Sequence, residues 1–204
     1  MDTEQRQAMV ERHRQSLMHY GYGPETLFWS TRGIQKQRFK VLSEIGIQNG
    51  DSLLDVGCGF ADLQSWLNGQ AIHVNYTGID LSPDILDTAK TMNPQLKLQC
   101  GELFDFNWPQ KSFDWLILSG TLNWNLHDDG HYAKRMIQHM FELCSQGVAF
   151  NMLNAQYCDH ALLGEMVAFD PEHMLDWCRS ITPQSQLRTD YLANDFTIYM
   201  HRMC

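Results

Sequence analysis

Residues 53–63 read Leu-Leu-Asp-Val-Gly-Cys-Gly-Phe-Ala-Asp-Leu, an apolar strand that runs into a glycine turn and then into a helix. Gly57 and Gly59 let the backbone turn sharply and approach a ligand closely, because neither carries a Cβ. The helix that follows directs its unpaired N–H groups toward the turn. Asp80 ends the next apolar run, 21 residues after Gly59. A carboxylate there accepts hydrogen bonds from both hydroxyls of a ribose, so the pattern predicts a nucleoside site.

The dinucleotide fingerprint requires a third glycine where this chain has Asp62, whose carboxylate would face the phosphates of a nicotinamide or flavin dinucleotide. The string instead resembles the first motif of the class I S-adenosylmethionine-dependent methyltransferases, acidic-x-Gly-x-Gly-x-Gly, whose ligand carries no phosphate. Asp55, Gly57 and Gly59 match this motif, and Ala61 replaces its last glycine.

The resemblance covers roughly residues 52–120. Gly101-Glu102 occupies the place of the family's Gly-Asp, and Ser112-Phe113-Asp114 opens an apolar run as the family's Ser-Phe-Asp does. The resemblance implies that Glu102 accepts from the adenine amino group and that Leu103 offers a backbone N–H to the ring. It also implies that the end of the fourth strand lines the methionine moiety. The cofactor residues expected from the core are Gly57, Cys58, Gly59, Asp80, Leu81, Glu102, Leu103, Ser119 and Gly120.

The first 46 residues lie outside the nucleoside pattern but are rich in aromatic side chains. In many methyltransferases of this size such a segment folds over the cofactor, and the run Gln-x-x-Arg-Phe at residues 35–39 resembles those caps. A guanidinium at Arg38 suits a bidentate grip on the cofactor's carboxylate. Tyr20 and Trp29 suit contact with the sulfonium, because aromatic faces attract cations. The alternative is that both aromatic residues only pack and that Arg38 is a solvated helix charge.

The middle of the chain alternates strand and helix patterns, which predicts an α/β fold with a doubly wound, mostly parallel sheet. The resemblance implies seven strands, the last one antiparallel, in a single methyltransferase domain over 1–204, with a helical cap over 1–46 and a Rossmann-like core over 47–204. Strands are expected near 52–56, 74–79, 96–99, 115–118, 148–151, 186–189 and 196–200, and helices near 61–67, 83–91 and 131–143. The residues from 157 to 171 are the least periodic and predict a lid or an inserted loop.

The composition limits the classes of partner that the protein is expected to bind. Fifteen Lys and Arg against 24 Asp and Glu give a net charge of −9, which repels a polyanion, so no nucleic acid is expected as substrate. The six cysteines form no Cys-x-x-Cys pair, which argues against structural zinc and a disulfide framework. No secretory segment or membrane-spanning run is visible, so we expect a cytoplasmic protein that binds no membrane.

The residues that follow the fourth strand are expected to face the methyl acceptor, because α/β ligands gather at the carboxyl ends of the strands. His127 and His131 are candidates for a catalytic base, because histidine is a common proton acceptor in enzymes. The alternative is that 128–131 form an acidic helix start and that His131 is a surface residue. His127, Asp128 and His131 lack a further ligand at a recognisable spacing, so no metal is expected.

These observations predict an S-adenosylmethionine-dependent methyltransferase that acts on a small-molecule acceptor and releases S-adenosylhomocysteine. Two alternatives stay open, because one scaffold supports all three functions. One is an aminopropyl-type transferase that uses a decarboxylated cofactor. The other is a non-catalytic module that binds an adenosyl cofactor and acts through a protein partner. The sequence identifies neither the acceptor atom nor the oligomeric state.

Overall fold

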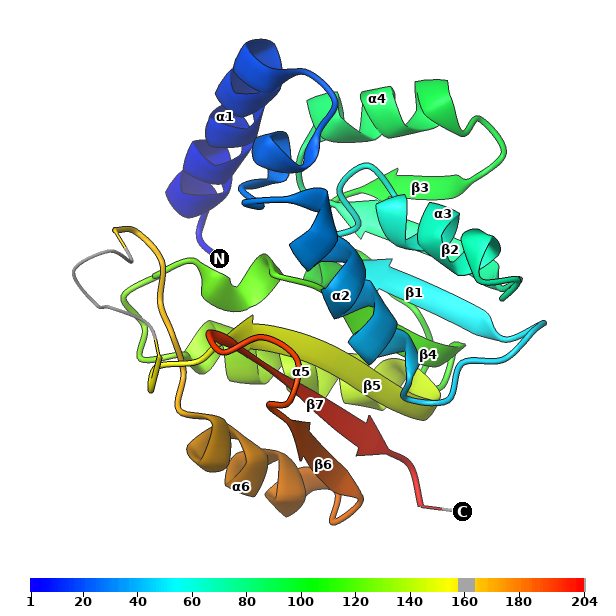
Figure 1. Ribbon diagram of the computed structural model, residues 1–204, viewed down its shortest axis with the longest axis vertical. Helices are drawn as coiled ribbons and strands as arrows, with labels where there is room; N and C mark the ends of the chain where they lie inside the picture. The colour runs from blue at the N-terminus through cyan, green and yellow to red at the C-terminus, as the bar shows by residue number, and fades with distance from the viewer. Residues whose placement is uncertain (158–163, 204) are drawn as a thin grey trace.

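A computed structural model describes residues 1–157 and 164–203 of the chain. Seven strands form one sheet in the order β3-β2-β1-β4-β5-β7-β6 (Figure 1). Every strand pair is parallel except the two that involve β7, so the predicted doubly wound sheet with an antiparallel last strand is confirmed. The strands are β1 Ser52–Val56, β2 Asn75–Asp80, β3 Lys97–Cys100, β4 Phe113–Leu118, β5 Cys144–Leu153, β6 Ser185–Arg188 and β7 Asp195–His201.

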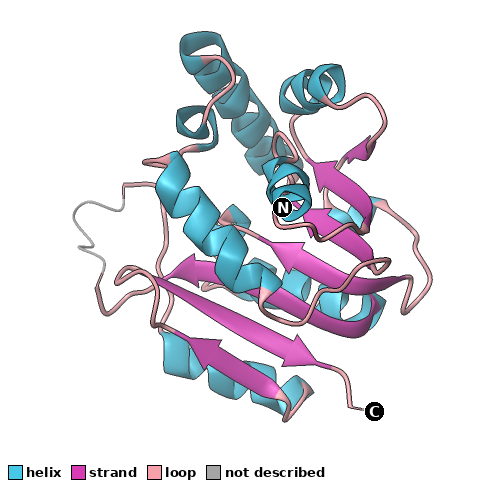
Figure 2. Cartoon of the chain, turned by 45° about the vertical axis from the view of Figure 1, so that its right-hand side comes forward, coloured by secondary structure: helices cyan, strands magenta, loops and turns pink. Residues whose placement is uncertain are grey.

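Helices cover both faces of the sheet (Figure 2). They are α1 Thr3–Tyr20, α2 Arg32–Ser43, α3 Asp62–Gly69, α4 Pro83–Met92, α5 His131–Leu143 and α6 Pro171–Ile181, with short 3₁₀ turns η1 Pro24–Leu27, η2 Leu103–Asp105 and η3 Thr121–Asn123. Side chains of α2, α3 and α4 pack in one buried cluster, and those of α5 and α6 pack in the other. The alternation along β1 fits this division, since Leu53 belongs to the first cluster and Leu54 to the second.

The sequence located most elements to within a few residues but underestimated β5. This strand begins at Cys144, directly after α5 ends, and runs ten residues rather than the four expected. It is long because β7 pairs with it from Gly147 to Leu153. The sequence reading also omitted α6. Its start carries an ordinary signal, because the Asp170 side chain caps the helix and Pro171 occupies the first turn.

Six of the residues in the aperiodic segment 157–171, numbers 158–163, lie outside the described part. The described remainder is tied to the core by isolated bridges, Trp124 with Met166 and Asn154 with Phe169. Val167 N–H also donates to Asn123 O at 2.7 Å. Residues 166–169 are therefore held against the segments that follow β4 and β5.

Two further findings concern the described residues alone. No helix among them combines the length and apolar character needed to cross a bilayer. No three His, Cys, Asp or Glu side chains among them gather closely enough to hold a metal ion.

Candidate active site

A cavity of about 950 Å³ opens where β1, β2 and β4 end. Its floor includes the glycine turn and the residues directly after β2 and β4. Walls are contributed by α1, η1, α2, the loop before α5, the starts of α5 and α6, and residues 166–170. This volume lies near the upper end of the range for small-molecule sites. The cavity stands where the strand order reverses, between β1 and β4, which is the usual ligand position in an open α/β sheet.

The glycine turn between β1 and α3 depends on both of its glycines. Gly57 and Gly59 have φ angles of +73° and +53°, in the region that L-residues with a Cβ avoid. A Cβ on Gly57 would lie 2.2 Å from Thr121 Oγ1, and one on Gly59 would lie 2.7 Å from the Leu27 side chain. The backbone N–H of Gly57 donates to Ile79 O at 2.8 Å, which fastens the turn to β2.

Asp80 lies at the cavity, as the sequence predicts, and is held by the backbone. Its Oδ2 accepts from Gly59 N–H at 2.9 Å, and its Oδ1 accepts from Ser82 N–H at 2.9 Å. Each carboxylate oxygen has a second lone pair for a ligand hydroxyl. Cys58 and Leu81 also line the cavity. Burial raises the pKa of the Cys58 thiol well above its usual range, so this group is an unreactive wall residue.

Asp55, the acidic residue of the motif, lies beneath the turn and contributes to the cavity floor. Tyr76 Oη donates to its Oδ2 at 2.6 Å. Removal from water raises the pKa of the Asp55 carboxyl to about 7, although the Tyr76 hydrogen bond opposes that rise.

Asp62 connects the N-terminal segment to the core, a role that the sequence did not reveal. Its Oδ1 accepts from Tyr22 Oη at 2.8 Å, and its Oδ2 accepts from Gln35 Nε2 at 3.1 Å. The carboxylate stands in the first turn of α3, where the helix dipole favours negative charge. The residue that the dinucleotide fingerprint would have as glycine therefore holds α2 and the segment between α1 and η1 over the turn.

Glu102 and Leu103 do not line the cavity itself. Leu103 is fully buried at the start of η2. Tyr132 Oη, from α5, donates to Glu102 Oε2 at 2.6 Å, and Arg6 Nε of α1 lies 3.6 Å from Glu102 Oε1. Because Tyr132 does line the cavity, the Glu102 carboxylate stands directly behind that part of the wall.

Arg38 is buried and already has a carboxylate partner. Its Nη2 donates to Asp195 Oδ1 at 2.6 Å, and its Nε donates to Asp195 Oδ2. The guanidinium carbon lies 4.4 Å from the centre of the Trp29 ring. Both Arg38 and Trp29 line the cavity, and a Cβ on Gly120 would lie 3.6 Å from Arg38 Nη1. One nitrogen of the guanidinium thus approaches the residues that follow β4.

Ser119 and Gly120 line the cavity at the end of β4, again as the sequence predicts. Gly120 N–H donates to Asn151 Oδ1 at 2.7 Å. Ser119 Oγ and Asn151 Nδ2 are buried and lack a hydrogen-bond partner within the described part of the chain. Such groups are costly when they stay unpaired, so this corner is suited to a polar ligand group.

The structure places one of the other predicted residues at the cavity and two of them away from it. His127 lines the cavity, with an exposed side chain and a φ of +55°. His131 begins α5, is exposed and does not line the cavity. Tyr20 ends α1 with 56% of its surface exposed and also lies outside the cavity lining. A histidine that the sequence reading missed, His13 of α1, does line it.

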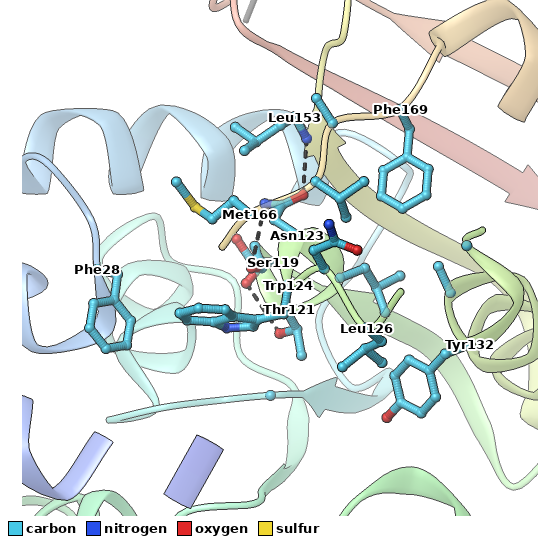
Figure 3. Close-up of a pocket in the computed structure, with 18 of the residues that line it drawn as sticks. Phe28, Ser119, Thr121, Asn123, Trp124, Leu126, Tyr132, Leu153, Met166 and Phe169 are labelled. Carbon is cyan, nitrogen blue, oxygen red and sulfur yellow. Dashed lines mark hydrogen bonds between the residues drawn. The ribbon is translucent and has the colours of Figure 1, made fainter. Parts of the chain in front are cut away.

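The wall beyond Ser119 is mainly apolar and aromatic. Figure 3 shows Phe28, Trp124, Met166 and Phe169 around this part, contributed by segments far apart in the sequence. Asn123 stands among them but serves the fold, because its Oδ1 accepts from Leu153 N–H at 3.0 Å. The space is therefore bounded by rings and aliphatic side chains, with histidines on two sides.

Helix α1 is attached to the core mainly by charged groups. Ser16 is its one buried residue. Arg6 pairs with Asp105, Arg14 Nε donates to Asp84 Oδ2 at 3.0 Å, and Arg12 pairs with Glu165. The Arg12 guanidinium carbon also lies 4.2 Å from the centre of the Trp124 ring.

The sequence over residues 53–147 matches the family described as methyltransferase domain. A protein of Mycobacterium tuberculosis named as a methyltransferase is 24% identical over 159 residues, which cover 74% of this chain and 93% of that protein. A protein of Schizosaccharomyces pombe named as an uncharacterized methyltransferase is 30% identical over 106 residues, or 48% of this chain. That match spans only 40% of the length of the S. pombe protein.

Solved structures share the fold at low sequence identity. Magnesium protoporphyrin IX methyltransferase from Synechocystis, solved with bound S-adenosylhomocysteine, has a TM-score of 0.65 and 13% identity over 96% of this chain and 94% of that chain. A methyltransferase from Archaeoglobus fulgidus has a TM-score of 0.66 and 10% identity over 84% of this chain and 95% of that one. With the strand order and the glycine turn, these matches show that residues 53–147 resemble a methyltransferase domain and that the chain has the class I methyltransferase fold.

Proposed function

We propose that this methyltransferase acts on a small molecule with a flat, apolar body. The observation that carries the proposal is the aromatic and aliphatic wall beyond Ser119, formed by Phe28, Trp124, Met166 and Phe169. Sites of this kind bind small ligands through apolar surface and orient them with a few polar groups. The net charge of −9 further disfavours a nucleic-acid acceptor.

The residues on the floor fit an adenosyl cofactor. The glycine turn leaves room for close approach, and the fixed carboxylate of Asp80 has lone pairs for the ribose hydroxyls. Unpaired Ser119 Oγ suits the polar methionine end. Glu102, behind Tyr132, is the group proposed for the adenine amino function. The remaining volume beyond Ser119 is then available to the acceptor.

When bound, the cofactor supplies a methyl group on a positively charged sulfur, which needs no further activation. The protein's part is to align the acceptor and exclude water, which lowers the entropic barrier to reaction. Trp124 and Phe28 form the wall that does this. A hydroxyl or ammonium acceptor must also lose a proton. Among the described residues three histidines line the cavity, His13, His127 and His173, and His127 and His13 are the two proposed to receive it.

His13 has a defined geometry for that role. Its Nδ1 lies 3.0 Å from Met9 O, so the neutral ring carries its proton on Nδ1 and keeps a lone pair on Nε2. Its ring centre lies 5.3 Å from that of Phe28, on the apolar side of the cavity. The hypothesis that His127 acts as the base stays a prediction beside this second candidate.

Calorimetric titration with S-adenosylmethionine and S-adenosylhomocysteine tests the cofactor site. We expect both to bind the wild-type protein. Asp80→Ala should weaken both by about 1–3 kcal/mol, because the ribose hydroxyls lose a charged acceptor. Asp87→Ala, on the neighbouring helix α4 and outside the cavity lining, is the matched control and should bind as the wild type does, because Asp87 pairs with Lys90 of its own helix. Equal affinity of wild type and Asp80→Ala would refute the placement of the ribose.

Release of S-adenosylhomocysteine in the presence of panels of phenols, thiols and amines, compared with a protein extract and RNA, tests the acceptor. Turnover only with flat small molecules supports the proposal. Turnover only with protein or RNA contradicts it. Tight cofactor binding with no turnover on any panel would favour the non-catalytic alternative.

A further inference from the structure

The buried ion pair of Arg38 and Asp195 is unusual for the place where it lies. Asp195 is fully buried at the start of β7, and Arg38 belongs to α2, 157 residues earlier. Moving both charges out of water is costly, and an apolar pair of similar volume is often as stable. A pair retained at the wall of a ligand cavity therefore raises the question of what it does for the ligand.

The pair fixes the guanidinium in one orientation. Two of its nitrogens, Nε and Nη2, are engaged by the two oxygens of Asp195. The ring of Trp29 lies against the guanidinium, 4.4 Å from its central carbon. The third nitrogen, Nη1, takes part in no hydrogen bond found within the described residues and is the one that approaches Gly120.

Two further donors without partners lie around Gly120. Ser119 Oγ is buried and lines the cavity, and Asn151 Nδ2 is buried on the strand behind, while the Oδ1 of the same amide holds Gly120 N–H. Donors without acceptors, beside a guanidinium with one unused nitrogen, are suited to a carboxylate, which presents only acceptors.

We propose that Asp195 is a positioning residue that holds Arg38 as the receptor for the α-amino carboxylate of the cofactor, with Ser119 completing the subsite. This proposal rests on the proposed cofactor site and specifies which residues bind the amino-acid end of the cofactor. Asp195 does not touch the ligand. It acts by occupying two of the three guanidinium nitrogens, so that the third is presented toward the end of β4.

Two ligands that differ in the amino-acid end provide the test. S-adenosylhomocysteine carries the α-amino carboxylate, and 5′-methylthioadenosine has the same adenosyl thioether without it. Titration calorimetry with the wild-type protein should show tighter binding of S-adenosylhomocysteine. Asp195→Asn should weaken S-adenosylhomocysteine by about ten- to one-hundred-fold and leave 5′-methylthioadenosine within about two-fold, as expected for a charge-assisted hydrogen bond.

Tyr191→Phe is the matched control. It removes the neighbouring hydrogen bond of Tyr191 with Thr197 of β7, 2.9 Å long, without touching Arg38. It should leave both affinities unchanged. If Asp195→Asn weakened both ligands equally, or neither, Asp195 would be a structural residue and the inference would be wrong.

Asp195→Asn leaves Arg38 buried without a charged partner, which could unfold the protein. The double variant Arg38→Met, Asp195→Leu removes both charges and keeps the volume apolar. It should fold and lose the preference for S-adenosylhomocysteine, and a retained preference would overturn the inference. If the wild type bound neither ligand, the cofactor site itself would be wrong and this subsite with it, a result distinct from equal weakening in the variant.

Discussion

Asp55 should make the free energy of unfolding of the protein fall as the pH rises. The carboxyl group is buried beneath the glycine turn, and its pKa is raised to about 7 from an ordinary value of 3.8. Between these two values the native state keeps a proton that the unfolded chain has lost. Stability therefore declines with increasing pH over this window, by about 1.36 kcal/mol per pH unit. The full contribution, present below pH 3.8, is lost once the pH passes about 7.

The loss over the whole window is about 4 kcal/mol, since it corresponds to the difference between the two pKa values. Asp55→Asn isolates this contribution, because the amide cannot titrate and its oxygen still accepts from Tyr76 Oη. Relative to the wild type, the variant should therefore gain stability steadily from pH 4 to pH 7. The difference between the two free energies of unfolding at each pH cancels the contribution of every other titrating group that the substitution leaves unchanged.

Urea unfolding at half-unit pH steps measures both free energies. Tyr76→Phe sharpens the test, because loss of its hydrogen bond should raise the pKa of Asp55 further and move the decline to higher pH. Parallel pH profiles for wild type and Asp55→Asn would show that Asp55 is ionised in the native protein and would refute the reasoning.

Substitutions at three other positions have expected outcomes. Ala61→Gly should change the free energy of unfolding by less than about 1 kcal/mol, because relief of the +60° φ angle is offset by the greater entropy of the unfolded chain and by the loss of a buried methyl group. Ala61→Val should lower it by at least about 2 kcal/mol in the same urea assay, because a branched side chain fits neither this φ angle nor the packed site. Asp62→Ala should cost about 1–3 kcal/mol and speed proteolysis within residues 1–46, whereas Asp51→Ala should leave that cleavage rate unchanged. Trp124→Ala should raise the KM of an identified acceptor at least about ten-fold with an unchanged cofactor Kd; the opposite pattern would place Trp124 at the cofactor instead.

The parts of the site that the sequence predicts best are local. Gly57, Gly59 and Asp80 are separated by one turn, one helix and one strand, so their spacing alone brings them together. The doubly wound, mostly parallel sheet followed from the same alternation of elements and is confirmed. Ala61 stands where the family's motif has its last glycine. Its φ angle of +60° explains why the family has glycine there, and the alanine of this chain adopts the same angle.

The missed contacts join residues that are distant in sequence. Asp195 meets Arg38 across 157 positions, because β7 inserts beside β5 beneath α2. Tyr132 reaches Glu102 across 30 positions, since its helix α5 follows β4 in the chain and Glu102 precedes β4. No local periodicity encodes such pairs. The His13 side chain was overlooked for the same reason, since a polar helix gives no indication of which of its faces meets the cavity.

The way in which α1 is attached sets how the cavity exchanges its contents. Helix α1 has one buried residue and only a few half-buried apolar ones, Met9, Val10 and Leu17, so it loses far less apolar contact when it moves away than the sheet and its packed helices would. The pairs of Arg12 and Arg14 are exposed, so each contributes little to stability and weakens as salt is added. Dissociation of the product should therefore quicken with ionic strength while the melting temperature stays nearly constant. The fold thus separates the rate of turnover from the durability of the enzyme.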